Sequence, residues 1–212
     1  MKLLIFGATG LVGGSLLEQL KTAHEVTIAV RDSSRIKADN FNIRVINFND
    51  FESFNLQEYD GVYCCLGTTI AKAGSKENFK KVDLEFVNLC FQYSIKTKAN
   101  FFCVISALGA NSKSRVFYNR IKGEMEDSLI GNQKVIIVRP SLLLGDRSES
   151  RPLEGLSIAL TRPFSKPLKF ILGKYAPIEA STVAKSMIDL SLTGRTQAKI
   201  EFLIKLPSGT QY

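Results

Sequence analysis

The stretch that most constrains the fold is the N-terminal segment MKLLIFGATGLVGGS, residues 1–15. The apolar run at residues 3–6 predicts a buried strand, and glycines then recur every third residue before the apolar positions take helical spacing. Such a turn lets the backbone approach a pyrophosphate, whose negative charge is favoured at a helix N-terminus. We therefore predict that a nucleotide diphosphate binds at Gly7, Thr9, Gly10, Leu11, Val12 and Gly13.

The GxxGxxG spacing by itself is a weak signal, because glycines can also serve only to turn the chain. The rest of the chain, however, alternates between strand and helix patterns. Strands are predicted at residues 26–30, 43–48, 61–66, 101–105, 135–138 and 200–204. One predicted helix runs from Phe79, with its apolar stripe at Val82, Phe86, Leu89, Cys90 and Tyr93. Another begins at Ser181 and ends at Gly194.

This alternation predicts right-handed crossovers and a parallel sheet. The expected fold class is a Rossmann-type doubly wound α/β domain spanning residues 1–212. Beyond residue 145 the alternation loosens, and residues 147–180 are expected to form a small irregular cap over the substrate.

Arg31 follows the second predicted strand, 21 residues after Gly10, where a dinucleotide fold places the group that contacts the adenosine ribose. Its planar guanidinium matches a 2′-phosphate, so we predict NADP, with NAD the less favoured cofactor. Arg35 would add a second contact. Asp32 argues against this interpretation, and an ordinary surface arginine is the alternative.

Two further strand ends complete the predicted cofactor site. Asp50 and Phe51 follow the third strand, where a carboxylate would meet the adenine amino group. The fourth strand ends in Leu66, Gly67 and Thr68, whose small members let the chain pass close to a cofactor. Ligands of parallel sheets bind beyond the carboxyl ends of the strands, so these segments should converge.

Three residues suggest the chemistry. Tyr118 and Lys122 are spaced i, i+4 and so share a helix face, where the ammonium would lower the pKa of the phenol toward working pH. Ser106 ends the fifth strand and would hydrogen-bond the substrate oxygen. The alternative is an ordinary helix with an exposed lysine and a half-buried tyrosine. The acidic residues of this helix are expected to face water: Glu124, Glu126 and Asp127.

The GATGLVG segment at residues 7–13, with Ser106, Tyr118 and Lys122, resembles the short-chain dehydrogenase/reductase superfamily in its atypical branch. A closer resemblance is to the small NAD(P)-binding proteins related to the animal Tat-interacting oxidoreductase-like protein. It is carried by LGTT at 66–69, AGS at 73–75, KVD at 81–83, RPS at 139–141, GDR at 145–147 and ESR at 149–151.

The resemblance implies that the turn glycines hold the pyrophosphate, Arg31 the 2′-phosphate and Asp50 the adenine. It also implies that Lys122 holds the nicotinamide ribose and that Pro140 approaches the carboxamide. Asn88 is a candidate for the superfamily's fourth catalytic residue, an asparagine, but we do not transfer that role to it.

Composition and charge indicate which other classes of protein this chain does not belong to. No apolar run is long enough to cross a bilayer or to form a signal peptide, so we expect a cytoplasmic protein. The four cysteines include the adjacent pair Cys64 and Cys65 and no CxxC motif, which predicts core residues and no metal site. The net charge of +8 comes from scattered residues, so we expect an anionic small ligand and no nucleic acid.

Together these features predict an NADP-dependent oxidoreductase that transfers a hydride to or from a small carbonyl or alcohol substrate. Two alternatives stay open. One is an epimerase-like enzyme acting on a nucleotide sugar, which keeps its cofactor through the cycle, although the short C-terminal region argues against so large a substrate. The other is a protein that senses NADP(H) without turnover. A homodimer is compatible with the sequence, which identifies neither the substrate nor the oligomeric state.

Overall fold

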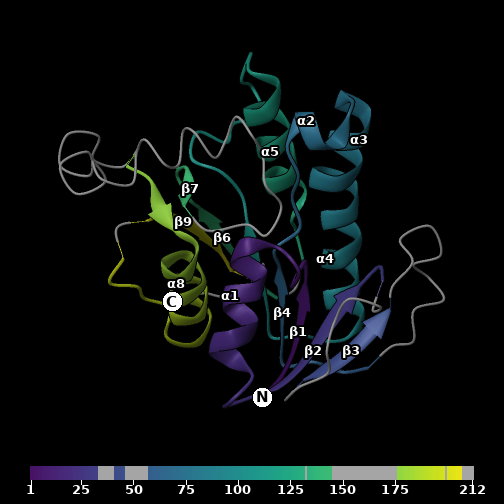
Figure 1. Ribbon diagram of the computed structural model, residues 1–212, viewed down its shortest axis with the longest axis vertical. Coiled ribbons are helices and arrows are strands. Elements are labelled where there is room, and N and C mark those ends of the chain that lie inside the picture. Colours follow the sequence, from purple (N-terminus) through teal and green to yellow (C-terminus); the bar gives the residue numbers. More distant parts are fainter. Residues whose placement is uncertain (33–40, 46–56, 132, 145–175, 199, 207–212) are drawn as a thin grey trace.

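The computed structural model describes residues 1–32, 41–45, 57–131, 133–144, 176–198 and 200–206 (Figure 1). Its strands are β1 (Lys2–Phe6), β2 (Glu25–Val30), β3 (Asn42–Val45), β4 (Gly61–Cys64), β5 (Phe101–Ile105), β6 (Lys134–Arg139), β7 (Leu143–Leu144), β8 (Ile178–Glu179) and β9 (Glu201–Lys205). Its helices are α1 (Leu11–Leu20), α2 (Ile70–Ala73), α3 (Lys76–Lys80), the π-helical turn η2 (Lys81–Glu85), α4 (Phe86–Lys96), α5 (Phe117–Ser128) and α8 (Ala180–Thr193).

Seven of the strands form one sheet in the order β3-β2-β1-β4-β5-β6-β9. Neighbouring strands are parallel except for β9, which runs antiparallel to β6. The direction of strand addition reverses at β1, with β2 and β3 on one side and β4 to β6 on the other. The doubly wound Rossmann-type fold is therefore confirmed, and its reversal point is where such sheets bind ligands.

Helices cover both faces of the sheet, because successive side chains of a strand point to opposite faces. In β1, Leu3 and Ile5 pack with α1 and α8 on one face, whereas Leu4 and Phe6 pack with α4 and α5 on the other. Figure 1 shows these two helix pairs on either side of the sheet. Each of these four side chains is fully buried and contributes about 1.5–3 kcal/mol to stability. The core thus anchors β1 and the glycine turn that follows it.

The start of α8 differs from the prediction, because Glu179 rather than Ser181 is the N-cap. Ser181 lies in the first turn, and its carbonyl accepts a hydrogen bond from Gln19 Nε2 of α1 at 3.2 Å. This contact between helices is absent from any local sequence pattern. The predicted end of α8 is confirmed, since Gly194 closes the helix with a left-handed backbone (φ 75°).

Helix α2 and the first residues of α3, before the predicted helix start at Phe79, were not predicted, although each helix has a side-chain cap. Thr69 Oγ1 accepts the backbone N–H of Lys72 at 3.2 Å, and Ser75 Oγ accepts that of Asn78 at 3.0 Å. Such caps satisfy helix N–H groups that otherwise lack an acceptor. They start two short helices after β4, and the second of them, α3, leads directly into η2 and α4.

The η2 turn shifts the buried face of this long run. A π turn holds one residue more than an α turn, so a stripe spaced for an α-helix falls out of register. Val82, Phe86 and Leu89 of the predicted stripe are only half-buried, whereas Asp83, Val87 and Cys90 are buried. The predicted stripe is therefore wrong at its first three positions, and an aspartate takes a core position in its place.

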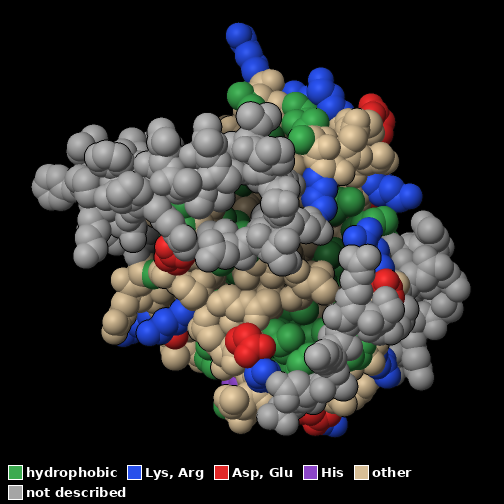
Figure 2. Space-filling model, in the orientation of Figure 1, with side chains coloured by type: hydrophobic (Ala, Val, Ile, Leu, Met, Phe, Trp, Pro, Cys, Tyr) green, Lys and Arg blue, Asp and Glu red, His purple; other side chains and the backbone are tan. Residues whose placement is uncertain are grey.

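Several predictions fall outside the described residues: the cap at 147–180 as far as residue 175, and the third strand beyond residue 45. Where the chain is described again, β8 pairs in parallel with β7 as a separate two-stranded sheet. Within the described ranges, no helix has the length and apolar character to span a membrane. Lysine and arginine side chains lie around the outline of the face shown in Figure 2.

Candidate active site

The glycine turn after β1 is too crowded for side chains. Gly7 has a left-handed backbone (φ 80°), and a Cβ on it would lie 2.7 Å from the carbonyl carbon and oxygen of Cys65. A Cβ on Gly13 would lie 2.2 Å from the Gly7 carbonyl oxygen. The N–H of Gly10 donates to the same oxygen at 3.0 Å, and Gly10 brings no side chain to cap α1. The first backbone N–H groups of α1 can therefore donate hydrogen bonds to an anion.

The other predicted residues of this turn differ in what they can offer a ligand. The Thr9 side chain is exposed, Leu11 is half-buried and Val12 is buried in the core between α1, α8 and the sheet. The Val12 side chain thus belongs to the fold, and only its backbone is left for a pyrophosphate. These positions stay predictions for cofactor contact.

The sheet brings the other predicted segments to one edge. Arg31 follows β2, Leu66 and Gly67 follow β4 and its neighbour Cys65, and Pro140 follows β6. Because β1, β2, β4, β5 and β6 are parallel, their carboxyl ends all lie at the edge where Gly7 begins the turn. Arg31 is exposed there. Three predicted contacts lie outside the described residues: Arg35, Asp50 and Phe51.

Ser106 is the first residue after β5 and is 3% exposed. Its N–H donates to the Val138 carbonyl at 2.8 Å, which fixes the serine against the end of β6. No described residue gives its Oγ a hydrogen-bond partner. A buried hydroxyl without a partner costs about 1–3 kcal/mol, so this orphaned group is a strong candidate for a ligand contact.

Two features connect this edge to α5. The loop after Ser106 returns to the helix, where the Asn111 N–H donates to the Asn119 carbonyl at 3.0 Å, next to Tyr118. On the other side, a Cβ built on Gly67 would lie 4.0 Å from Lys122 Nζ. Lys122 therefore lies by the Gly67 segment, and the loop that begins at Ser106 contacts α5 next to Tyr118.

Tyr118 and Lys122 occupy the same side of α5, as their spacing predicted. The Tyr118 ring packs against Phe79 with 5.5 Å between ring centroids. Burial raises the pKa of Tyr118, Lys122 opposes this, and Asp83 adds to the rise. The predicted fall of the tyrosine pKa is therefore wrong in its net direction, because burial and a carboxylate outweigh the lysine.

The residue that sequence reasoning missed is Asp83. Its Oδ1 lies 2.7 Å from Lys122 Nζ, and its Oδ2 accepts the Thr68 N–H at 2.9 Å. Burial would lower the pKa of Lys122, but Asp83 and Tyr118 outweigh burial and raise it. A signal was present, since Asp83 lies four residues after the buried Phe79 and four before the buried Val87.

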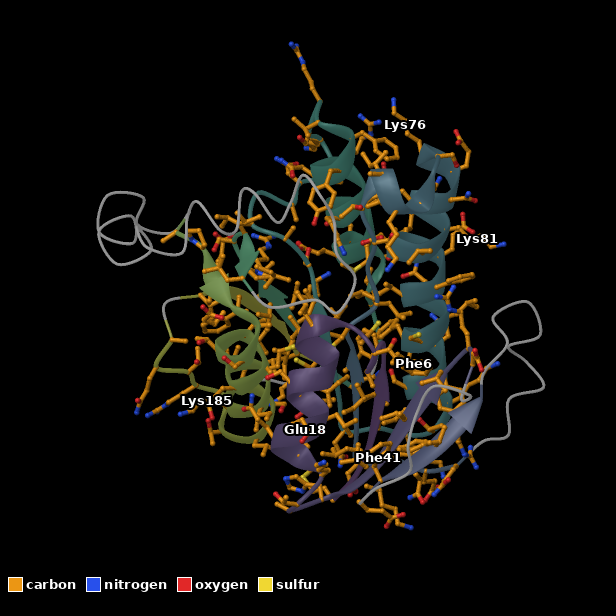
Figure 3. The ribbon with its side chains drawn as sticks, viewed as in Figure 1. Phe6, Glu18, Phe41, Lys76, Lys81 and Lys185 are labelled. Carbon is orange, nitrogen blue, oxygen red and sulfur yellow. The ribbon has the colours of Figure 1, made fainter. Side chains whose placement is uncertain are left out.

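Neighbouring lysines on the same run behave as ordinary surface residues. Lys76 and Lys81 point outward from α3 and η2 in Figure 3, whereas Asp83 is fully buried. The candidate asparagine, Asn88, contacts α5 at its C-terminal end rather than at Lys122. Its Oδ1 accepts a hydrogen bond from Ser128 Oγ at 2.7 Å near the end of α5.

The acidic face predicted for α5 requires one correction. Glu126 is 3% exposed rather than solvated. Arg139 holds it with two hydrogen bonds of 3.0 and 2.6 Å and reaches Glu201 of β9 at 2.6 Å. These contacts join α5, β6 and β9, so Glu126 stabilises the fold.

The chain is similar in sequence to a known protein family and to known proteins. A family model described as NAD(P)H-binding matches residues 7–149. Protein FMP52 of Candida albicans is 34% identical over 206 residues, which cover 92% of this chain and 89% of the relative. Protein HTATIP2 of Rattus norvegicus is 30% identical over 197 residues, covering 87% and 78%.

The names of the yeast relatives correct one expectation. FMP52 of Candida albicans and FMP52 of Debaryomyces hansenii are both named mitochondrial proteins. The expected cytoplasmic location is therefore wrong. It came from the absence of an apolar signal or membrane segment, and apolar length does not distinguish the cytoplasm from the mitochondrion.

Solved structures show the same fold. UDP-glucose 4-epimerase from Thermotoga maritima superposes with a TM-score of 0.70 and 16% identity, covering 91% of this chain and 74% of that one. MoeE5, solved with UDP-glucose and NAD, gives a TM-score of 0.67 at 13% identity. The chain belongs to the NAD(P)H-binding family and is a homologue of the FMP52 and HTATIP2 proteins, which confirms its resemblance to the atypical short-chain dehydrogenase/reductases.

Proposed function

We propose that this protein is an NADP-dependent oxidoreductase that transfers a hydride between the nicotinamide and a small carbonyl or alcohol substrate. The observation that carries the proposal is the Ser106 hydroxyl, which is buried and lacks a partner within the described residues. It lies at the end of β5, and the loop that follows it contacts the helix that bears Tyr118 and Lys122 through Asn111 and Asn119. A carbonyl oxygen of a substrate would give that hydroxyl the acceptor it lacks.

The residues of the site fit a nicotinamide dinucleotide. The turn formed by Gly7 and Gly13 is a cradle that a Cβ would fill, and the amides of α1 would bind the pyrophosphate. Lys122 would hold the nicotinamide ribose, and Pro140 would lie by the carboxamide. When bound, the cofactor supplies or accepts the hydride. Tyr118 then gives or takes the proton at the substrate oxygen, and Ser106 orients that oxygen.

The preference for NADP rests on Arg31. Its side chain is exposed after β2, next to the strand that leads into the glycine turn. A guanidinium can hold a 2′-phosphate with two parallel hydrogen bonds, whereas a free 2′-hydroxyl would gain little from it. Arg35 is proposed as a second phosphate contact, and Asp50 and Phe51 are proposed to lie by the adenine.

Binding of NADPH and NADH to the purified protein tests the cofactor assignment. Replacing Arg31 by alanine should weaken NADPH binding by about 10- to 100-fold, as expected for a charged hydrogen bond worth about 1.5–3 kcal/mol, and leave NADH binding unchanged. Arg195→Ala is the matched control, because Arg195 is exposed after α8, whose last turn lies by Lys134 at the opposite edge of the sheet. Equal loss for both cofactors would remove the role of Arg31.

Turnover on a panel of small aldehydes and ketones tests the chemistry. Tyr118→Phe should lower turnover by about 100-fold or more, as for loss of a general acid, while NADPH binding persists. A Tyr118→Phe variant with full turnover would exclude the proton-transfer role. Bound NADP(H) without turnover, together with a co-purified partner, would favour a sensing protein. Conversion of a nucleotide sugar without net cofactor consumption would favour an epimerase.

A further inference from the structure

Asp83 is buried at the candidate active site by contacts from two directions. The side chains of Asp83 and Lys122 are 1% and 4% exposed, and Oδ1 lies 2.7 Å from Nζ in the geometry of an ion pair rather than of an aligned hydrogen bond. Oδ2 accepts the N–H of Thr68, in the segment after β4 that passes Lys122. The carboxylate therefore ties η2 to α5 and to the proposed cofactor segment at once.

We propose that Asp83 is a positioning residue that neutralises Lys122 and thereby keeps Tyr118 in its protonated form, so that the resting site holds the proton that reduction of a carbonyl consumes. This inference rests on the proposed function. Asp83 is not proposed to contact the substrate, because its carboxylate acts through Lys122.

The charges around the phenol support this assignment. Tyr118 faces Lys122 on its own helix, Asp83 from η2 and the uncharged ring of Phe79 from α3, while the Cys64 thiol of β4 lies near Lys122. With the phenol protonated, the buried carboxylate and ammonium sum to zero. A phenolate would leave this water-poor site with a net negative charge, which burial opposes. Burial accordingly raises the pKa of Tyr118, Lys122 lowers it, and Asp83 offsets part of the effect of the lysine.

The protonation state decides which half-reaction finds the phenol ready to act. In reduction, the carbonyl carbon would gain the hydride that a bound cofactor supplies, the C=O π electrons would move to oxygen, and that oxygen would take the proton of the Tyr118 hydroxyl. The phenolate left behind regains a proton from solvent. Oxidation of an alcohol would instead need the phenolate at the start, and the neutral pair of Asp83 and Lys122 leaves little of it near pH 7.

A phenolate titration of the protein without cofactor tests this without turnover. The ultraviolet difference between the wild type and Tyr118→Phe isolates Tyr118 from the other tyrosines. We expect its phenolate to appear only above the ordinary tyrosine pKa of about 10. Ionisation below that value would overturn the proposal, whatever the variants of Asp83 do.

Two variants of Asp83 then separate charge from shape. Asp83→Asn should move the Tyr118 phenolate signal to lower pH, because loss of one proton would now leave the site neutral rather than negative. Asp83→Glu keeps the charge and should leave the signal near its wild-type position. Asn88→Ala is the matched control, since Asn88 lies on the following helix and contacts Ser128 instead.

The pH profile of kcat/KM for carbonyl reduction gives a second readout. The wild-type rate should hold into the alkaline range, whereas Asp83→Asn should shift the alkaline limb to lower pH and reduce the neutral rate by up to about 100-fold through misplacement of Lys122. A rate loss without a shifted limb would indicate a merely structural role and overturn the proposal. The expected titration in a protein with no carbonyl turnover would support the assignment of Asp83 but overturn the proposed function.

Discussion

Replacing Gly13 by alanine tests whether the turn after β1 is held in shape by contacts between backbones. The added Cβ would lie 2.2 Å from the Gly7 oxygen, 2.8 Å from the Gly7 carbonyl carbon and 3.0 Å from the Ala8 Cα. All three are backbone atoms, so the turn and α1 must separate by about 1 Å to restore ordinary contact. Such overpacking costs about 1–3 kcal/mol, of which the better helix propensity of alanine returns at most about 1 kcal/mol.

We therefore expect Gly13→Ala to lower the free energy of unfolding by about 2 kcal/mol and the melting temperature by roughly 4–8 °C. The displaced turn should also weaken NADPH binding by about 10- to 100-fold, since a shift of 1 Å misplaces the amides that meet the pyrophosphate.

The next glycine provides the matched control. A Cβ on Gly14 would lie 3.4 Å from the Ala8 oxygen, which is ordinary contact, so Gly14→Ala needs no displacement. It should stabilise α1 by about 0.5–1 kcal/mol and leave NADPH binding unchanged. Thermal melts and fluorescence titration with NADPH measure both effects. If Gly13→Ala melted and bound NADPH like the wild type, the crowded turn would not be what positions the cofactor.

Three further predictions concern buried polar groups. Glu126→Gln should lower the unfolding free energy in urea by about 1.5–3 kcal/mol, because Arg139 loses its charged hydrogen bonds to Glu126 and keeps only Glu201 as an anionic partner. Tyr63→Phe should cost about 1 kcal/mol in the same assay, because its buried hydroxyl bonds Ser191 Oγ at 2.6 Å. The raised pKa of Lys122 contributes stability that is fully present below the ordinary lysine pKa of about 10.4. This contribution is lost as the pH rises through the pKa of Lys122 in the folded protein. The stability of Lys122→Met should therefore decline less steeply at alkaline pH than that of the wild type.

Sequence patterns predicted the central fold well because its signals are local. The apolar run of β1 and the glycines after it lie within fifteen residues, and strands buried on both faces appear as continuous apolar runs. The start of α8 was missed because Glu179 caps it without a side-chain hydrogen bond, directly after its pairing with Leu144 of β7, which no local pattern includes. The π turn η2 was missed because a prediction from periodicity assumes a constant number of residues per turn.

The candidate site was predicted where a strand end or a helix spacing placed the residue. Ser106, Tyr118 and Lys122 meet these conditions, and Tyr118 and Lys122 lie near each other on α5, whereas the catalytic roles of all three stay predictions. Glu126 was misassigned to the solvated face because its partner Arg139 lies 13 residues later, on a different element. Helix periodicity alone contains no information about such a partner. The contacts of Arg35, Asp50 and Phe51 stay predictions.

Asp83 shows how two misfits in the sequence can explain each other. The aspartate stands between the buried Phe79 and Val87, and the lysine stands on the buried face of α5, 39 residues apart. Burial of either charge by itself would cost several kcal/mol, so each requires the other. Once paired, they leave Tyr118 facing a neutral site, in which loss of its proton creates the only net charge among these three groups. The contact that permits burial of the lysine is therefore the same contact that would keep the phenol ready to donate its proton.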